Sequence, residues 1–190
     1  MLEDGSVYEG TARGDFKETA CEIVFNTSMT GYVEILTDPS YAGQGVVMTY
    51  PMIGNYGISR EDFESERLQP SAFIVHELSS DPSNFRCTDT IENLLKEYNI
   101  PCISGVDTRA VVKKLRESGT MRGVLTSDIG DRERLMDVIK SFRQIDLVGS
   151  VTAKQTKVYG EENTGAEIAL MDFGTKRNII NNLVKRNCIV

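Results

Sequence analysis

Apolar residues alternate with polar ones and turn signals along the first sixty residues, which is the pattern of short β-strands. Three runs are rich in β-branched and aromatic residues, and we expect a strand in each: residues 6–9, 22–25 and 45–50. Residues 31–36 have the spacing of a short helical turn. Pro39 ends that turn, because proline disfavours helix at the residue before it and favours a tight turn.

From residue 71 onward the pattern changes to alternating strand and helix. The expected strands are residues 72–76, 101–104 and 123–126. Three helices are expected between and after them: one capped by Asp89 with Glu92 completing a capping box, one capped by Asp107 or Thr108 and ended by Gly119, and one over residues 131–142. Strands that alternate with helices favour βαβ units with parallel pairing.

The last forty-five residues follow a different pattern. Residues 146–164 are polar and turn-prone, as linkers between domains tend to be. A strand is then expected over residues 168–174, a helix follows, and residues 188–190 start another strand. Since so few elements cannot bury both faces of a sheet, this tail is typical of the opening of a second α/β domain. We expect one apolar helix face to be exposed: Ile179, Ile180, Leu183 and Val184.

Charge and composition exclude several classes of function. The 190 residues carry a net charge of −7, which argues against binding to nucleic acid or to anionic lipid. No run approaches 18 apolar residues, so a membrane span is not expected. The acidic start lacks the basic and apolar segments of a signal peptide, and we therefore expect a cytoplasmic protein.

The four cysteines do not form a metal-ligand pattern. Cys21, Cys87, Cys102 and Cys188 are widely separated, and His76 is the only histidine. No metal site is expected from this set. Cys21 and Cys102 lie within apolar runs, which favours small buried side chains.

Several polar groups are candidates for a functional site. No nucleophile elbow, phosphate loop or dinucleotide fingerprint is present. His76 at the end of an apolar run is more typical of a structural histidine. Asp107-Thr108-Arg109 is either an anion site at a helix start or a plain helix cap. The acidic residues 61–66 are either a cation site or, more typically, a solvated loop, and residues 54–57 form a loop without the lysine of a phosphate cradle.

The densest group of hydroxyl and amide side chains is the segment 26–44, which includes Ser40 directly after Pro39. The spacing alone indicates a turn residue at Ser40 more strongly than a ligand-binding one. Together with other runs this segment resembles the small, glutaminase subunit of carbamoyl-phosphate synthases. The runs that carry the resemblance are EIVFNTSMTGY (22–32), EILTDPSY (34–41), TYPMIGNYG (49–57), SNFR (83–86), GVDTR (105–109) and DFGTKRNI (172–179).

The resemblance implies a fold and a division into domains. Residues 1–150 would form the small-subunit N-terminal domain, an α/β fold of the layered β/β/α swivelling type that docks onto the large synthetase subunit. Residues 151–166 would be a linker, and residues 167–190 the truncated start of a flavodoxin-like class I glutamine amidotransferase domain. That domain uses a Cys–His–Glu triad, and we assign no catalytic residue within these 190 positions, Cys188 included.

The resemblance also implies a function. The family hydrolyses glutamine and passes ammonia to the large subunit, which makes carbamoyl phosphate from bicarbonate and ATP for pyrimidine and arginine biosynthesis. Ser40 matches the serine of this domain that helps to hold glutamine. ATP and a divalent metal are expected on the large subunit, and no cofactor on this chain. The alternative is a free-standing binding or assembly module without catalytic activity.

Overall fold

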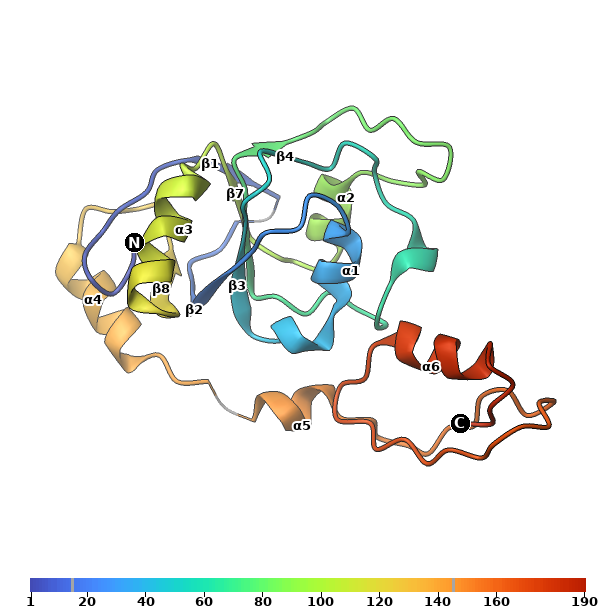
Figure 1. Ribbon diagram of the computed structural model, residues 1–190. Helices are drawn as coiled ribbons and strands as arrows, with labels where there is room; N and C mark the ends of the chain where they lie inside the picture. The colour runs from blue at the N-terminus through green and yellow to red at the C-terminus, as the bar shows by residue number, and fades with distance from the viewer. Residues whose placement is uncertain (15, 145) are drawn as a thin grey trace.

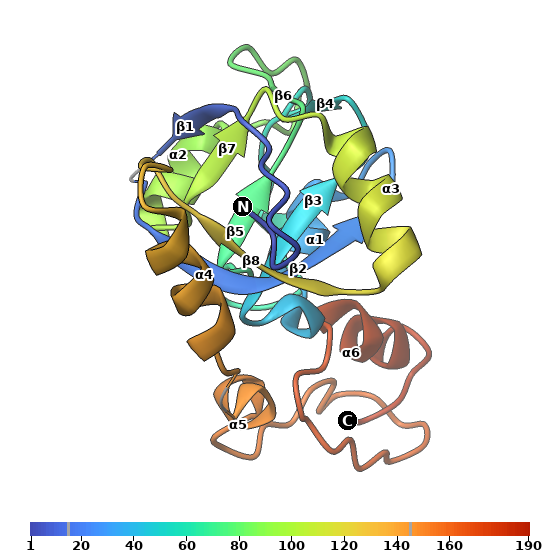
Figure 2. The same cartoon turned by 90° about the vertical axis from the view of Figure 1, so that its left-hand side faces the viewer.

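The computed structural model describes residues 1–14, 16–144 and 146–190. Within those ranges, six strands form one curled sheet in the order β1-β7-β5-β3-β2-β8 (Figures 1 and 2). The strands are β1 (Thr11–Arg13), β2 (Thr19–Asn26), β3 (Gln44–Met48), β5 (Ala72–Ile74), β7 (Cys102–Ser104) and β8 (Met121–Leu125). A separate parallel pair joins β4 (Met52–Ile53) to β6 (Glu77–Leu78).

The centre of the sheet is parallel and its two edges are antiparallel. β2, β3, β5 and β7 pair in parallel, with Val46 of β3 opposite Val24 of β2 and Phe73 of β5. β1 runs antiparallel to β7, and β8 runs antiparallel to β2. The parallel pairing expected from the βαβ pattern is therefore confirmed, and so is the α/β class. The swivelling-type layering and the domain boundaries stay predictions.

Helices cover both faces of the sheet. Figure 1 shows α1 and α2 on one side of the strands and α3 on the other. The helices are α1 (Tyr32–Thr37), α2 (Ile91–Glu97), α3 (Thr108–Ser118), α4 (Arg132–Ser141), α5 (Leu147–Val151) and α6 (Arg177–Val184), with 3-10 turns η1 (Pro39–Tyr41) and η2 (Arg60–Asp62).

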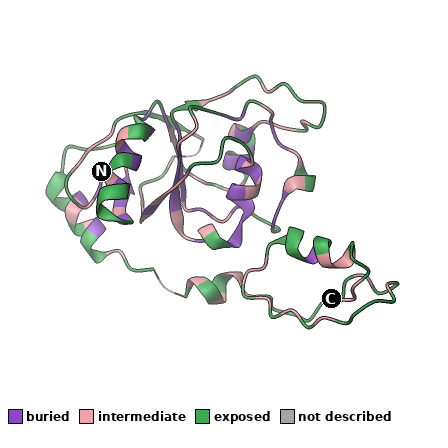
Figure 3. Ribbon diagram, in the orientation of Figure 1, coloured by how far each residue is buried: buried purple, intermediate pink, exposed green. Residues whose placement is uncertain are grey.

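Alternation along the central strands divides the core into two main clusters. Successive side chains of a strand point to opposite faces, so Val46 and Val47 of β3 enter different clusters. Val46 packs in the cluster that contains Leu36 of α1 and Leu94 of α2. Val47 packs in the cluster that contains Leu115 of α3. Figure 3 shows this buried interior between the exposed outer helix faces.

Most expected elements are present, and before the tail three local details of the sequence interpretation are wrong. Residues 6–9 are not a strand; the chain instead pairs through Leu2, which bridges Gly123 of β8. Thr90, not Asp89, is the N-cap of α2, because its side chain accepts from the Asn93 amide. Glu92 closes no capping box and pairs with Lys96 four residues later at 3.0 Å.

The tail after α5 is more irregular than its sequence pattern predicts. Residues 168–174 are not a strand, although Glu167 forms one parallel bridge to Ile189. A single bridged pair is too little to make a regular strand, because strands need a wider sheet for stability. The expected exposed face of α6 is also partly wrong, since Ile180 is buried while Ile179 is exposed. Within the described ranges, no helix is long and apolar enough to cross a membrane.

Candidate functional site

Ser40 lies in a short turn, residues 38–41, which we call the serine turn. Asp38 caps it: one carboxylate oxygen accepts from the Ser40 amide at 2.9 Å. Pro39 stands at the first position of the 3-10 turn, where its missing N–H costs no hydrogen bond. The Ser40 side chain is exposed, and among the described residues no hydrogen bond engages its hydroxyl. That hydroxyl is free to donate to or accept from a ligand.

Two tyrosine side chains, one from α1 itself and one from the 54–57 loop, fix the helix that leads into the serine turn. Gly31, the N-cap of α1, has a φ of 82° and no side chain with which to cap the helix. The Tyr56 hydroxyl replaces that cap by accepting from the Gly31 and Tyr32 amides at 2.6 and 3.2 Å. The Tyr32 hydroxyl donates in turn to the Gly57 carbonyl at 2.8 Å, and the Tyr32 and Tyr56 rings stack with centroids 4.2 Å apart. The 54–57 loop is therefore a support for α1.

The C-terminal end of α1 is held by the loop that contains Glu64. The Thr37 hydroxyl accepts from the Glu64 amide at 2.9 Å, and the Ser65 hydroxyl donates to the Thr37 carbonyl. On the sheet side, Asn26 at the end of β2 donates to the Tyr41 hydroxyl at 2.8 Å. The serine turn is thus fixed at both of its ends by residues from other elements.

The segment just before and at the start of α6 packs against the serine turn. Lys176 donates to Asp38 at 2.6 Å, and this hydrogen bond raises the pKa of the Lys176 ammonium. Gly174 has a φ of 105°, and a Cβ added there would come within 3.1 Å of the Pro39 Cβ and 2.8 Å of the Val151 Cγ2. A larger residue at position 174 would therefore push the segment away from the turn.

Glu64 makes the second connection to α6. One of its carboxylate oxygens accepts from the Asn178 amide at 2.9 Å and the other from the Asn178 side-chain nitrogen at 2.8 Å. Its backbone carbonyl accepts from the Arg177 amide at 2.8 Å. Glu64 and Asp38 are both buried, which is uncommon for carboxylates and is compensated here by these partners.

The other sequence candidates lie in ordinary structural roles. His76 is exposed and its Nδ1 is 3.0 Å from the Val106 carbonyl oxygen. Asp107 caps α3 by accepting from the Ala110 amide at 2.9 Å, while Arg109 is exposed on the helix surface. These residues are separate from the serine turn in the hydrogen-bond network. The geometry supports a structural role for His76 and an ordinary helix cap for Asp107.

The acidic residues 61–66 do not act as one group. Glu61 and Asp62 pair with Arg86 at 3.3 and 2.6 Å, and Glu66 lies 3.5 Å from Lys157. Glu64 points instead to α6. Across the part of the chain that the structure describes, no three His, Cys, Asp or Glu side chains gather into a group that could hold a metal ion.

The cysteines behave as their sequence surroundings predict. Cys21 and Cys102 are fully buried, and burial raises the pKa of each thiol to about 12. A thiol with such a pKa is not a nucleophile at neutral pH. Cys87 and Cys188 are half-buried free thiols.

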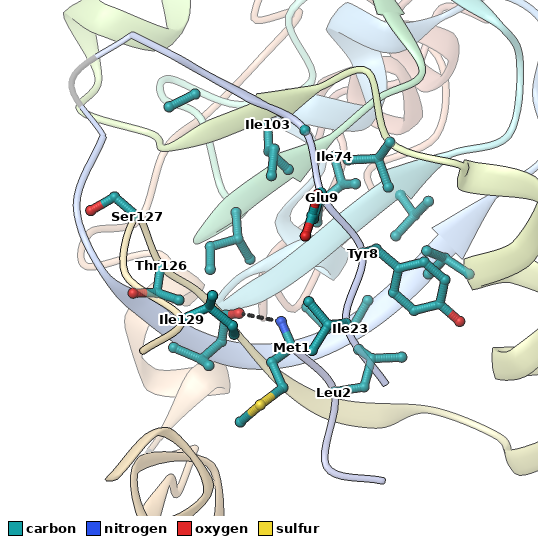
Figure 4. Close-up of a pocket in the computed structure, with 18 of the residues that line it drawn as sticks. Met1, Leu2, Tyr8, Glu9, Ile23, Ile74, Ile103, Thr126, Ser127 and Ile129 are labelled. Atoms are coloured by element: carbon teal, nitrogen blue, oxygen red, sulfur yellow. Dashed lines mark hydrogen bonds between the residues drawn. The ribbon is translucent and has the colours of Figure 1, made fainter. Parts of the chain in front are cut away.

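A separate apolar cavity of about 420 Å³ opens beside the N-terminus (Figure 4). Its lining includes Leu2, Ile23, Ile74 and Ile103, and the Met1 ammonium at its edge donates to the Val124 carbonyl at 2.9 Å. Burial lowers the pKa of that ammonium group. None of the serine-turn residues lines this cavity. Its lining is mainly apolar and also includes Glu9 (Figure 4).

The sequence suggested Ser40 as a glutamine contact, which stays a prediction, and it did not identify the residues that fix the surroundings of Ser40. Asp38 was included only within the run 34–41, and Glu64 only among the acidic residues 61–66, interpreted as a cation site or a solvated loop. Lys176 and Asn178 belong to the run 172–179, and the sequence predicted no individual role for either residue. The sequence signal that could have suggested a buried Glu64 is the pair of large apolar residues nearby, Phe63 and Leu68. The structure buries both of them.

Comparison with known proteins identifies the family. Residues 1–125 match the family model for the carbamoyl-phosphate synthase small chain, CPSase domain. The carbamoyl phosphate synthase small chain of Clostridium perfringens is 48% identical over 191 residues, covering 100% of this chain and 54% of that protein. The small chain of Archaeoglobus fulgidus is 47% identical, covering 97% of this chain and 52% of that protein.

The similarity extends through the serine turn and the start of α6, since the alignment with the Clostridium perfringens protein covers the whole of this chain. The chain spans about half the length of the curated relatives that it matches. It corresponds to their N-terminal region. This chain belongs to the carbamoyl-phosphate synthase small chain family.

Proposed function

We propose that this chain serves as the N-terminal region of a glutamine-hydrolysing subunit that supplies ammonia for carbamoyl phosphate synthesis. Its partner is the large synthetase subunit, which carries the ATP and divalent metal sites. The product feeds pyrimidine and arginine biosynthesis in the cytoplasm. Family membership supports the partner and the reaction class, because the relatives are named as small chains of this synthase.

Within that subunit the role of this region is to hold and orient glutamine. In the hydrolysis a thiolate attacks the side-chain amide carbon of glutamine, ammonia leaves, and water then cleaves the thioester to glutamate. The cysteine, histidine and glutamate for these steps belong to the amidotransferase domain, outside the 190 residues. Ser40 contributes a hydroxyl that hydrogen-bonds the substrate and takes no part in bond making.

One observation supports this role above the others: the Ser40 hydroxyl is exposed on a turn that is fixed on the side facing α6. The cap from Asp38 and the contact of Pro39 with Gly174 place the turn beside the first helix of the C-terminal segment. A free hydroxyl on a rigid support loses little conformational entropy on binding a ligand. A simple surface turn would not require such support.

The test replaces Ser40 in the full-length small chain assembled with its large chain. Ser40→Ala is expected to raise the KM for glutamine about five- to tenfold, which corresponds to the loss of one hydrogen bond. Carbamoyl phosphate synthesis from added ammonia bypasses glutamine and should be unchanged. Ser118→Ala, at an exposed serine at the end of α3, is the matched control.

An unchanged KM for glutamine in Ser40→Ala would refute the assignment of Ser40. The free-standing binding module is the competing function, and it predicts a different pair of results. That module would associate with its partner protein while no substitution at the serine turn affected a glutamine-dependent rate. Association with the large chain together with the raised KM supports the glutaminase role instead.

A further inference from the structure

Two buried carboxylates, Asp38 and Glu64, connect the sheet-containing body to the start of α6; we call this pair the carboxylate clamp. Their exposures are 6% and 7%, and each accepts hydrogen bonds from residues more than a hundred positions away in the chain. Two apolar residues would fill such an interface at a lower desolvation cost. The choice of charged groups therefore indicates a need for a defined geometry.

Glu64 supplies the N-terminal cap that α6 lacks locally. The N-cap residue of α6 is Lys176, whose side chain makes no capping hydrogen bond with the described residues. The Glu64 carboxylate accepts from the Asn178 amide instead, at the helix end where the macrodipole favours a negative charge. Its second oxygen accepts from the Asn178 side chain, so both carboxylate oxygens hold the same residue at the start of the helix.

Asp38 connects the same segment directly to Ser40. Its Oδ1 accepts from the Ser40 amide at 2.9 Å while its Oδ2 accepts from the Lys176 ammonium at 2.6 Å. One carboxylate thus contacts both the Ser40 amide and the N-cap residue of α6. A shift of Lys176 would have to move the Asp38 carboxylate, and with it the peptide that carries Ser40.

The loop that contains Glu64 reaches the serine turn by a second route. The Glu64 amide donates to the Thr37 hydroxyl at 2.9 Å, one residue before Asp38. The two members of the clamp are therefore joined on the body side as well as through Lys176 and Asn178. The arrangement is a closed set of contacts rather than two isolated ion pairs, and such sets define position more strictly than single pairs do.

We propose that Asp38 and Glu64 are positioning residues that set where the Ser40 hydroxyl stands relative to the C-terminal segment and hence to bound glutamine. The inference rests on the proposed function of Ser40. It goes beyond that function because it assigns the relative position of the serine turn and the α6 segment to two particular carboxylates. Neither carboxylate touches the substrate in this scheme.

The experiment combines a physical and a kinetic measurement. Amide hydrogen exchange on the 190-residue chain follows the Asn178 amide, and steady-state kinetics on the full-length subunit with its large chain follow the KM for glutamine. Glu64→Gln keeps the size of the side chain and one acceptor oxygen, but it removes the negative charge at the start of α6 and one of the two acceptors for Asn178. The matched control is Glu61→Gln, three residues away, whose exposed carboxylate contacts Arg86.

A second variant covers the case in which Glu64→Gln fails to fold. Lys176→Met removes the partner of Asp38 from a side chain that is 45% exposed, so the body of the fold should tolerate it. Its control is Lys185→Met at the other end of α6. Both test variants are expected to raise the KM for glutamine several-fold, with ammonia-dependent synthesis unchanged. Glu64→Gln should also lower protection of the Asn178 amide about tenfold.

The double variant Ser40→Ala/Glu64→Gln decides whether the clamp acts through Ser40. If it does, Glu64→Gln adds little to the KM of Ser40→Ala, because the hydroxyl that it positions is already gone. Additive effects on KM would overturn the proposal, and so would an unchanged KM in both Glu64→Gln and Lys176→Met while Ser40→Ala raises it. In these cases the proposed function of Ser40 survives. An unaffected KM in Ser40→Ala refutes that function, and the clamp's assigned role with it.

Discussion

Replacing Tyr56 with phenylalanine is the sharpest test of how the serine turn is supported. The substitution removes one oxygen atom and leaves the ring, so the stacking of rings 56 and 32 with centroids 4.2 Å apart is retained. What is lost is the acceptor for the Gly31 and Tyr32 amides at 2.6 and 3.2 Å. These two N–H groups open α1, and the Gly31 cap has no side chain to replace the acceptor.

The expected cost follows from the loss of a helix cap. Removing an N-cap acceptor destabilises a protein by about 1 kcal/mol, within a range of roughly 0.5–2. Tyr32 is buried, and unpaired amides beside a buried side chain lie toward the upper part of that range. We therefore expect Tyr56→Phe to lower the free energy of unfolding by about 1–2 kcal/mol. For a chain of this size each kcal/mol corresponds to a fall in Tm of about 2–4 °C.

Urea denaturation followed by circular dichroism measures this change, and amide hydrogen exchange locates it. Exchange should accelerate in α1 and the serine turn before it does in α3, because the lost cap lies at the start of α1. Tyr159→Phe is the control, since the exposed Tyr159 ring belongs to the tail. A midpoint for Tyr56→Phe equal to that of the parent, with unchanged exchange in α1, would show that the hydroxyl is not the cap.

Two further predictions concern charge and thiol chemistry. Arg134 hydrogen-bonds Glu18 and lowers the pKa of that carboxyl from 4.5 to about 2. Because the pKa of Glu18 is lower in the folded state, the pair stabilises the fold above pH 4.5, and this contribution is lost as the pH falls toward 2. Glu18→Gln should therefore lower the urea midpoint at pH 7 but not near pH 2. Native protein should expose at most Cys87 and Cys188 to a thiol reagent, whereas four thiols should react in denaturant, and rapid native labelling of Cys21 or Cys102 would contradict their burial.

Local sequence signals predicted most of the structure that depends on near neighbours. The caps of α3 and α4 come from Asp107 and Asp131, each bonded to an amide three residues later. The sequence pattern predicted Asp107 or Thr108 for the first cap and a helix from residue 131 without a named cap. Both contacts form within one turn of chain, so they depend on the local sequence. The same holds for the alternation of Val46 and Val47 between two core clusters. Where two local candidates compete, as Asp89 and Thr90 do, the pattern did not identify the residue that caps the helix.

The sequence by itself determined the class of the fold and the order of most elements. Its motifs also indicated the family and suggested Ser40 as a ligand-binding residue. The tertiary structure alone decided which groups support the serine turn. Tyr56 caps α1 from 25 positions away, and Glu64 caps α6 from 114 positions away. The physical reason is that a hydrogen bond depends on distance in space. The path of the chain through the sheet brings these donors and acceptors together, and no periodicity in the sequence encodes that path.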